Sequence, residues 1–112
     1  MAYDEELAHR IRALLADHPG VTETQMFGGL AFLVGGHMAI AASRLGGVLV
    51  RVDPAQSDHL VETTAAEEAI MRGRPAQGWL RIDAEHVRTK RQLERWVKLG
   101  AAQAGSLPPK RR

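Results

Sequence analysis

The sequence of 112 residues contains no cysteine. This absence excludes a disulfide framework, thiol catalysis and thiolate metal sites, and it is typical of proteins in a reducing cytosol. Aromatic residues make up only 4% of the chain, so the core must consist mainly of aliphatic side chains. The chain also lacks a basic N-terminal segment followed by an apolar run, and it lacks an apolar run long enough to cross a bilayer. We therefore expect a cytoplasmic protein with no membrane partner.

Motifs of the common enzyme classes are missing as well. No serine lies in the Gly-x-Ser-x-Gly turn of hydrolases. The glycine pairs match neither a P-loop nor the Gly-x-Gly-x-x-Gly of a dinucleotide-binding fold. Glu67 and Glu68 are adjacent, so on a helix they would point to different sides rather than into a shared cleft. We expect no catalytic residues and no cofactor, and we predict that the protein is not an enzyme.

The five histidines do not show the local spacing of metal ligands. No two of them are four residues apart, and no His-Glu-x-x-His motif occurs. We expect no metal site, and a site assembled from distant histidines is the alternative. His37 directly follows a glycine pair and is expected to be an exposed or hydrogen-bonded loop residue rather than a base. The histidines are His9, His18, His37, His59 and His86.

The most distinctive stretch covers residues 22–52, where short apolar runs are separated by glycine pairs. Glycine readily adopts the positive φ of tight turns, so these pairs favour chain reversals. Gly35-Gly36, for example, predicts the two-residue loop of a hairpin. The pattern indicates an antiparallel meander with strands at residues 21–27, 30–34, 37–42 and 48–52.

Capping residues and apolar periodicity predict three helices. Asp4 is expected to cap the first helix, and Asp53, which precedes a proline, is expected to cap the second. Thr89 and Gln92 have the spacing of a capping box at the start of the last helix, which is expected to end at Gly105. The first and the last helix each carry an apolar stripe that could cover a sheet.

The remaining segment is less regular. Residues 63–71 favour a further short turn of helix, and residues 79–83 favour a last strand. The order of elements predicts an α+β fold with two layers, in which an antiparallel meander sheet of about five strands is covered by an N-terminal, a middle and a C-terminal helix. Residues 1–112 are expected to form a single domain with a short basic tail at residues 106–112.

Charge is distributed unevenly along the chain. Residues 1–80 carry 6 Lys/Arg and 10 Asp/Glu, a balance of −4, whereas residues 81–112 carry 9 and 3, a balance of +6. This basic third could meet an acidic partner, a phosphate backbone or the acidic part of a second copy, or it could be a solvated helix face with a basic tail. The candidate contacts for a partner protein or nucleic acid are Arg72, Arg74, Arg88, Lys90, Arg91, Arg95 and Lys98.

Four residues that precede this basic third form a recognisable DNA-binding pattern. Arg72-Gly73-Arg74-Pro75 matches the core of the AT-hook, an extended basic peptide that lies in the minor groove of DNA. AT-hooks normally lie in flexible basic tails, whereas acidic residues precede this one. The structural alternative is a glycine–proline connection whose arginines face solvent.

Several motifs occur together and in a fixed order. They are Met26-Phe27-Gly28-Gly29-Leu30-Ala31-Phe32, Gly73-Arg74-Pro75, Gly78-Trp79, Leu93 with Trp96-Val97, and Ser106-Leu107-Pro108-Pro109-Lys110. This set resembles the N-terminal domain of the TfoX/Sxy family over residues 3–110. The family takes its name from bacterial regulators of natural competence that act with the cyclic-AMP receptor protein. The resemblance implies a two-layer fold with an antiparallel sheet and a role in transcription regulation.

Two differences limit what the resemblance implies. The longer competence regulators have a second, helical domain, and this sequence resembles a single-domain member. His37 stands where relatives tend to have a small polar residue, and the segment before Gly73 lacks their usual Asp-Phe pair. The resemblance implies no catalytic residues.

We therefore expect a non-enzymatic regulatory domain that binds another protein, such as a transcription factor. Self-association as a homodimer would be favoured if an edge strand or one face of the sheet is left uncovered. The first alternative is direct nucleic-acid binding through the basic C-terminal third, with an affinity that falls steeply as salt rises. The second is an undetected enzyme or small-ligand binder, which would need a pocket with convergent polar groups.

Overall fold

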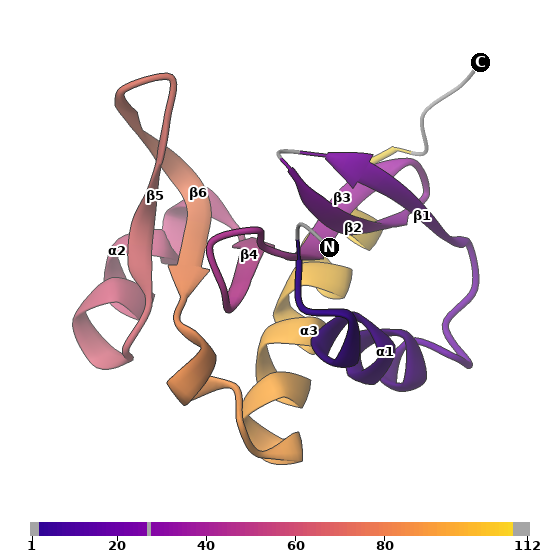
Figure 1. The fold of residues 1–112 in the computed structure, drawn as a ribbon. Coiled ribbons are helices and arrows are strands. Elements are labelled where there is room, and N and C mark those ends of the chain that lie inside the picture. The colour runs from indigo at the N-terminus through magenta and orange to yellow at the C-terminus, as the bar shows by residue number, and fades with distance from the viewer. Residues whose placement is uncertain (1–2, 27, 109–112) are drawn as a thin grey trace.

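The computed structural model describes residues 3–26 and 28–108 (Figure 1). Phe27, which was expected in the first strand and the core, lies outside the described residues. The order of helices and strands confirms the predicted α+β fold. In chain order the elements are α1 (Glu5–Leu14), β1 (Val21–Met26), β2 (Gly29–Val34), β3 (His37–Ala42), β4 (Val48–Arg51), α2 (Pro54–Thr63), β5 (Glu67–Met71), β6 (Arg74–Ile82), a 3₁₀ turn η1 (Ala84–His86) and α3 (Lys90–Ser106).

All six strands form one antiparallel sheet with the order β1-β2-β3-β4-β6-β5. Strands β1 to β4 follow one another as the predicted meander. Gly35 and Gly36 form the β2–β3 turn with φ values of 61° and 85°, which the sequence pattern anticipated. Strand β6 then pairs with β4, and β5 pairs with β6 as the edge strand. The sheet therefore has six strands rather than about five.

The additional strand is β5, and it corrects the prediction of a helical turn over residues 63–71. Helix α2 ends at Thr63, and the chain is extended again from Glu67. Alanine and glutamate favour helices, but this intrinsic preference is weak and is readily outweighed by tertiary contacts. Here pairing with β6 and burial of Ala69, which is 2% exposed, stabilise the extended conformation.

A two-residue turn at Arg72-Gly73 joins β5 to β6. Its φ values of 53° and 78° are both positive, as a type I′ hairpin turn requires. Strand β6 starts directly afterwards at Arg74, so the predicted strand at residues 79–83 is only the second half of the real one. The Arg72-Gly73-Arg74-Pro75 sequence is therefore a hairpin tip with exposed arginines, rather than a link between a helix and a strand.

The helix starts agree with the predicted caps. The Asp4 carboxylate accepts two backbone N–H groups of α1 at 3.0 and 3.1 Å, and the Asp53 carboxylate accepts one of α2 at 2.9 Å. Thr89 and Gln92 form the predicted capping box of α3, with both hydrogen bonds at 3.1 Å. Helix α3 ends at Ser106, one residue beyond its predicted end.

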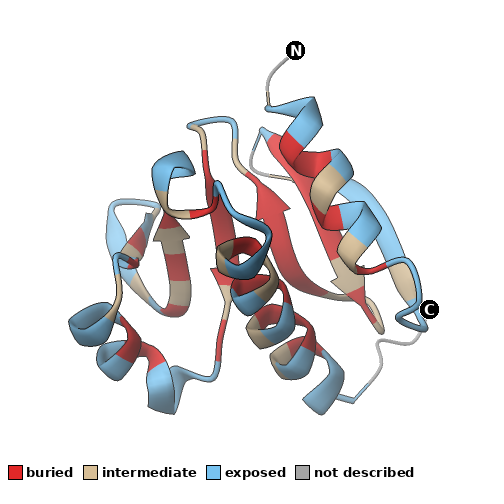
Figure 2. Ribbon diagram, turned by 90° about the horizontal axis from the view of Figure 1, so that it is seen from below, coloured by how far each residue is buried: buried red, intermediate tan, exposed pale blue. Residues whose placement is uncertain are grey.

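The three helices lie on the same face of the sheet, which confirms the two-layer arrangement (Figure 2). Between helices and sheet lies the main core, to which each helix contributes buried residues. Examples are Leu7 and Ile11 of α1, Leu60 of α2, and Leu93 of α3, all at most 6% exposed. The opposite face of the sheet is therefore not covered by these helices.

Candidate functional site

The face of the sheet opposite the helices carries a second apolar cluster that contains no helical residue. Most of its buried members are alanines, and larger, partly buried apolar side chains pack against them. Trp79 lies on this face with the Arg51 guanidinium 5.2 Å from its ring centre. The buried members are Ala31, Met38, Ala41, Leu49 and Ala69, and the partly buried ones are Met26, Leu33, Met71 and Trp79.

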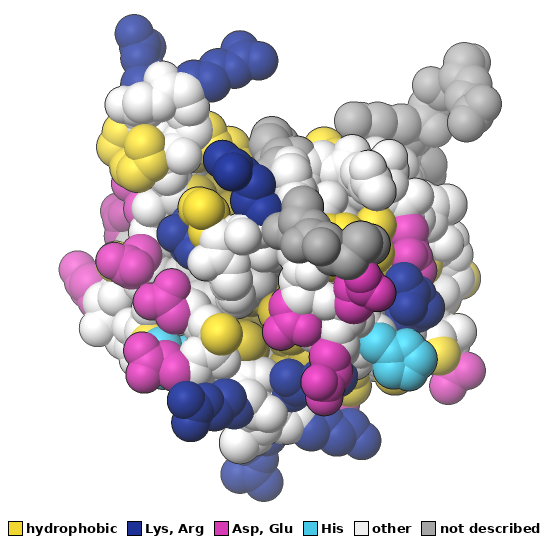
Figure 3. All heavy atoms as spheres, in the orientation of Figure 1, with side chains coloured by type: hydrophobic (Ala, Val, Ile, Leu, Met, Phe, Trp, Pro, Cys, Tyr) yellow, Lys and Arg dark blue, Asp and Glu magenta, His cyan; other side chains and the backbone are white. Residues whose placement is uncertain are grey.

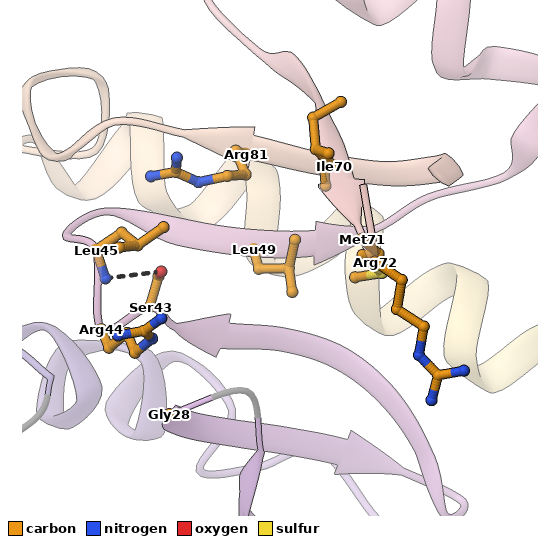
Figure 4. A pocket seen from close by; sticks show the side chains of 10 residues that line it. Gly28, Ser43, Arg44, Leu45, Leu49, Ile70, Met71, Arg72 and Arg81 are labelled. Atoms are coloured by element: carbon orange, nitrogen blue, oxygen red, sulfur yellow. Dashed lines mark hydrogen bonds between the residues drawn. The ribbon is translucent and has the colours of Figure 1, made fainter. Parts of the chain in front are cut away.

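A cleft of about 840 Å³ opens on this face (Figure 4). One side is formed by the loop between β3 and β4, the other by the end of β5 and its turn, and Leu49 of β4 lies between them. The volume is within the usual range of ligand and peptide sites. We call this site the arginine cleft, and it is lined by Gly28, Ser43, Arg44, Leu45, Leu49, Ala69, Ile70, Met71, Arg72 and Arg81.

Two exposed apolar side chains border the arginine cleft. Leu45 in the β3–β4 loop is 64% exposed, and Ile70 in β5 is 62% exposed. The third large apolar side chain exposed in the described chain is Val61 of α2, at 37%. Figure 4 shows Leu45 and Ile70 on either side of Leu49, with the Ile70 side chain directed away from Leu49. Single exposed apolar residues are common on proteins, whereas these two lie beside the same cleft with an apolar floor.

The charged residues that line the cleft are all arginines. Arg44 lies in the loop between β3 and β4. Arg81 lies near the end of β6, where β6 pairs with the start of β4. These two residues therefore lie at the same end of the sheet, whereas Arg72 belongs to the β5–β6 turn (Figure 4). No Asp or Glu is among the residues that line the cleft.

Arg81 has an unused hydrogen-bonding group. Its Nη2 lies 3.8 Å from a carboxylate oxygen of Asp83, which is a loose ion pair. Its Nε is buried and has no hydrogen-bond partner among the described residues. Buried donors are normally satisfied, so this unpaired one is unusual.

The structure separates the seven predicted basic contacts into two groups. Arg72 and Arg74 lie at the β5–β6 hairpin tip, and the other five lie on α3 and in the loop before it. Figure 1 places the hairpin tip and the start of α3 at opposite ends of the molecule, and Figure 3 shows Lys and Arg side chains gathered at both places. The two groups therefore do not form one surface.

The second group makes up an exposed basic face. Arg91, Arg95 and Lys98 have the i, i+4, i+7 spacing that aligns side chains along one side of a helix. Two of these cations have partners, because the Arg95 guanidinium lies 5.5 Å from the Trp96 ring centre and the Lys98 Nζ lies 4.0 Å from Glu94. We call this group the α3 basic face, and it consists of Arg88, Lys90, Arg91, Arg95 and Lys98, all exposed.

The histidines lie on separate parts of the fold: His9 on α1, His18 before β1, His37 on β3, His59 on α2 and His86 in η1. Within residues 3–26 and 28–108, no group of three or more His, Asp or Glu side chains could hold a metal ion. His37 is a strand residue rather than a loop residue. Its Nε2 lies 2.6 Å from the carbonyl oxygen of Pro108, so it is hydrogen-bonded as expected.

Arg72 is the one predicted contact that lines the arginine cleft, and Arg44, Leu45 and Ile70 are among the lining residues that were not predicted. Leu45 could have been noticed, because it is a large apolar residue in a loop that also contains Gly46-Gly47, and turns usually hold polar residues. Ile70 carried no such signal, since its segment was interpreted as a helix. Arg81 was predicted to lie on the face opposite Leu80 and Ile82, and the structure places it there.

The sequence matches the TfoX N-terminal domain over residues 13–104, which is most of the chain. No curated protein matches it. Within the described part of the chain, no helix is both long and apolar enough to span a membrane.

Proposed function

We propose that this chain, which belongs to the TfoX N-terminal domain family, is a non-enzymatic regulatory domain that acts by binding another protein through the arginine cleft. The observation that carries the proposal is the exposure of Leu45 and Ile70 beside an apolar floor. Burial of such side chains against a partner removes apolar surface from water, which is the main favourable term in protein association.

The lining of the arginine cleft supports binding rather than catalysis. Among the described residues that line it, none is a His, Asp or Glu that could act as a general acid or base. Its one hydroxyl belongs to Ser43, whose Oγ accepts a hydrogen bond from the backbone N–H of Leu45 at 3.1 Å. This local bond is typical of a serine that stabilises a turn. The chemistry of the cleft therefore fits recognition.

Site-specific photo-crosslinking in the source cells tests this proposal. A photoreactive amino acid at position 45 or 70 should give a crosslinked product with a partner protein. The same amino acid at position 61, which is exposed on α2 outside the cleft, is the matched control. A product of twice the chain mass would identify the partner as a second copy. Equal crosslinking from all three positions, or none from 45 and 70, would contradict the proposal.

The α3 basic face supports a second candidate function, direct binding to nucleic acid. Its five exposed cations lie on one helix and the loop before it. Binding to the phosphate backbone that is independent of base sequence depends mainly on such Lys and Arg side chains. If all five contact phosphates, the slope of log affinity against log salt should be about −4.5 for duplex DNA. Fluorescence anisotropy with a short duplex measures it, and binding that is unchanged in an Arg91→Glu/Arg95→Glu variant would refute this function.

A further inference from the structure

We infer that the arginine cleft recognises an acidic amphipathic segment of the partner protein. In this arrangement the apolar side chains of the segment lie against Leu45, Leu49 and Ile70, and its carboxylates lie against Arg44 and Arg81. The inference rests on the proposed function, and it adds the chemistry of the partner. Three observations support it: the charge of the lining, the position of the exposed apolar residues, and the contact of the Trp79 ring with Arg51.

The charge of the lining favours an anionic partner. Three arginines line the cleft without a carboxylate among the lining residues, and the nearest ion pair of Arg81 is a loose one at 3.8 Å. Its Nε has no acceptor in the described chain. Carboxylates form short, charge-assisted and often bidentate hydrogen bonds with arginine. An acidic segment would therefore place carboxylates against the arginines that line the cleft.

The exposed apolar residues favour a peptide segment over a small anion. Leu45 lies at the arginine end of the cleft, and Ile70 lies across the floor from it (Figure 4). A small anion bound at Arg44 and Arg81 would leave the 62% exposed side chain of Ile70 in water. A segment that crosses Leu49 covers both borders and reaches both arginines. Apolar side chains between carboxylates are thus the composition that fits.

The same face is a poor platform for nucleic-acid bases. Single-stranded nucleic acids stack their bases on exposed aromatic rings. Trp79 is the aromatic residue of the second apolar cluster, and it is partly buried with the Arg51 guanidinium 5.2 Å from its ring centre. Its ring is therefore already in contact with a cation. The described residues that line the cleft itself include no aromatic side chain. An amphipathic peptide suits this surface better than a base.

Selection of binders from a library of random peptides displayed on phage tests the inference without assuming a sequence. The full chain is immobilised, and the enriched peptides are sequenced. We expect peptides that combine Asp or Glu with large apolar residues. A synthetic peptide of the enriched sequence is then titrated against a Trp96→Phe variant, in which Trp79 is the remaining tryptophan and reports on the cleft face by fluorescence.

Matched variants locate the binding site. Arg44→Glu and Ile70→Ser should each weaken binding of the selected peptide by at least about tenfold, because each removes a contact at one end of the cleft. Arg91→Glu on the α3 basic face and Val61→Ser on α2 make the same chemical changes elsewhere and should leave the affinity within about twofold. Unchanged denaturant midpoints of all four variants show that the fold is intact.

Three outcomes would overturn the inference: no enrichment over bare support, enrichment of basic or uncharged peptides, or binding that Arg91→Glu weakens and Arg44→Glu does not. The crosslinking experiment separates this failure from failure of the proposed function. A partner captured from position 45 or 70, together with peptides that do not fit the cleft, would leave the binding function standing and refute the acidic segment alone.

Discussion

The Arg12 guanidinium donates two hydrogen bonds to the Glu23 carboxylate, from Nε at 2.6 Å and from Nη2 at 2.8 Å. This bidentate pair joins α1 to β1, the edge strand of the sheet. The hydrogen bonds from Arg12 lower the pKa of Glu23 from its usual value of 4.5, and those to Glu23 raise the pKa of Arg12. The pair is partly exposed, with side-chain exposures of 48% and 34%, so solvent weakens it.

Glu23→Gln should lower the free energy of unfolding by about 0.5 kcal/mol near neutral pH, as is usual for a solvent-screened pair. Because the folded pKa of Glu23 is lowered, its contribution is complete above the usual pKa of 4.5 and is lost as pH falls through the folded value. Urea unfolding at about pH 7 and about pH 3 should show a larger difference from wild type at the higher pH. Glu62→Gln, at an exposed position on α2, is the control. A difference of equal size at both pH values would contradict the prediction.

Ser57 is the one buried polar side chain of the described core, and its Oγ accepts the backbone N–H of Gly78 at 3.3 Å. This bond ties α2 to the middle of β6. Ser57→Ala leaves the buried N–H without an acceptor and should cost about 1–3 kcal/mol of stability. Ser106→Ala is the control, since the Ser106 hydroxyl makes an exposed bond and should matter by less than about 0.5 kcal/mol. Similar losses in chemical denaturation would show that the buried bond contributes nothing.

Arg72 is the only non-glycine residue with positive φ among the described residues. Asparagine tolerates this conformation and is preferred before glycine in type I′ turns. Arg72→Asn should therefore stabilise the protein by about 0.5 kcal/mol, which is a modest part of the strain of an ordinary residue there. Arg74→Asn removes the same charge from the first position of β6 and should be neutral or destabilising, because asparagine is disfavoured in strands. A stabilisation of equal size in both variants would attribute the effect to charge instead of backbone conformation.

Most of the fold could be predicted because its signals are local. The Asp4 and Thr89 caps and the Gly35-Gly36 turn each depend on a few neighbouring residues, and the structure contains all of them. Strand β5 could not be predicted in this way. Its residues favour a helix on their own, and they are extended because they pair with β6 across the Arg72-Gly73 turn.

The candidate site was harder to predict than the fold. Its residues come from the β3–β4 loop, β4, β5 and β6, so the site exists only once the sheet is assembled. The basic residues were chosen because Lys and Arg are frequent in that part of the sequence, which says nothing of their surroundings in the fold. Only Arg72 among them lines the arginine cleft. Arg44 and Arg81 were not among the chosen residues, and only the assembled sheet places them beside an apolar surface.

Helix α3 crosses the sheet closely at Gly100, which is buried. A Cβ at this position would overlap the carbonyl oxygen of Ala39 in β3. Alanine normally stabilises a helix interior over glycine by about 0.8–1 kcal/mol. Here the backbone of β3 cannot move aside as a flexible side chain would, so we expect the opposite sign. Gly100→Ala should lower the free energy of unfolding by about 1–3 kcal/mol, the usual cost of overpacking.

Gly105→Ala is the matched substitution in the same helix. The nearest atom to its added Cβ is Val34 Cγ1 at 4.0 Å, an ordinary contact. Helix propensity should therefore dominate, with a gain of about 0.5 kcal/mol near the helix end. Guanidinium unfolding of both variants gives the comparison. If Gly100→Ala also stabilised the protein, α3 would have to lie further from β3, and the covered face of the sheet would be less tightly packed than its geometry indicates.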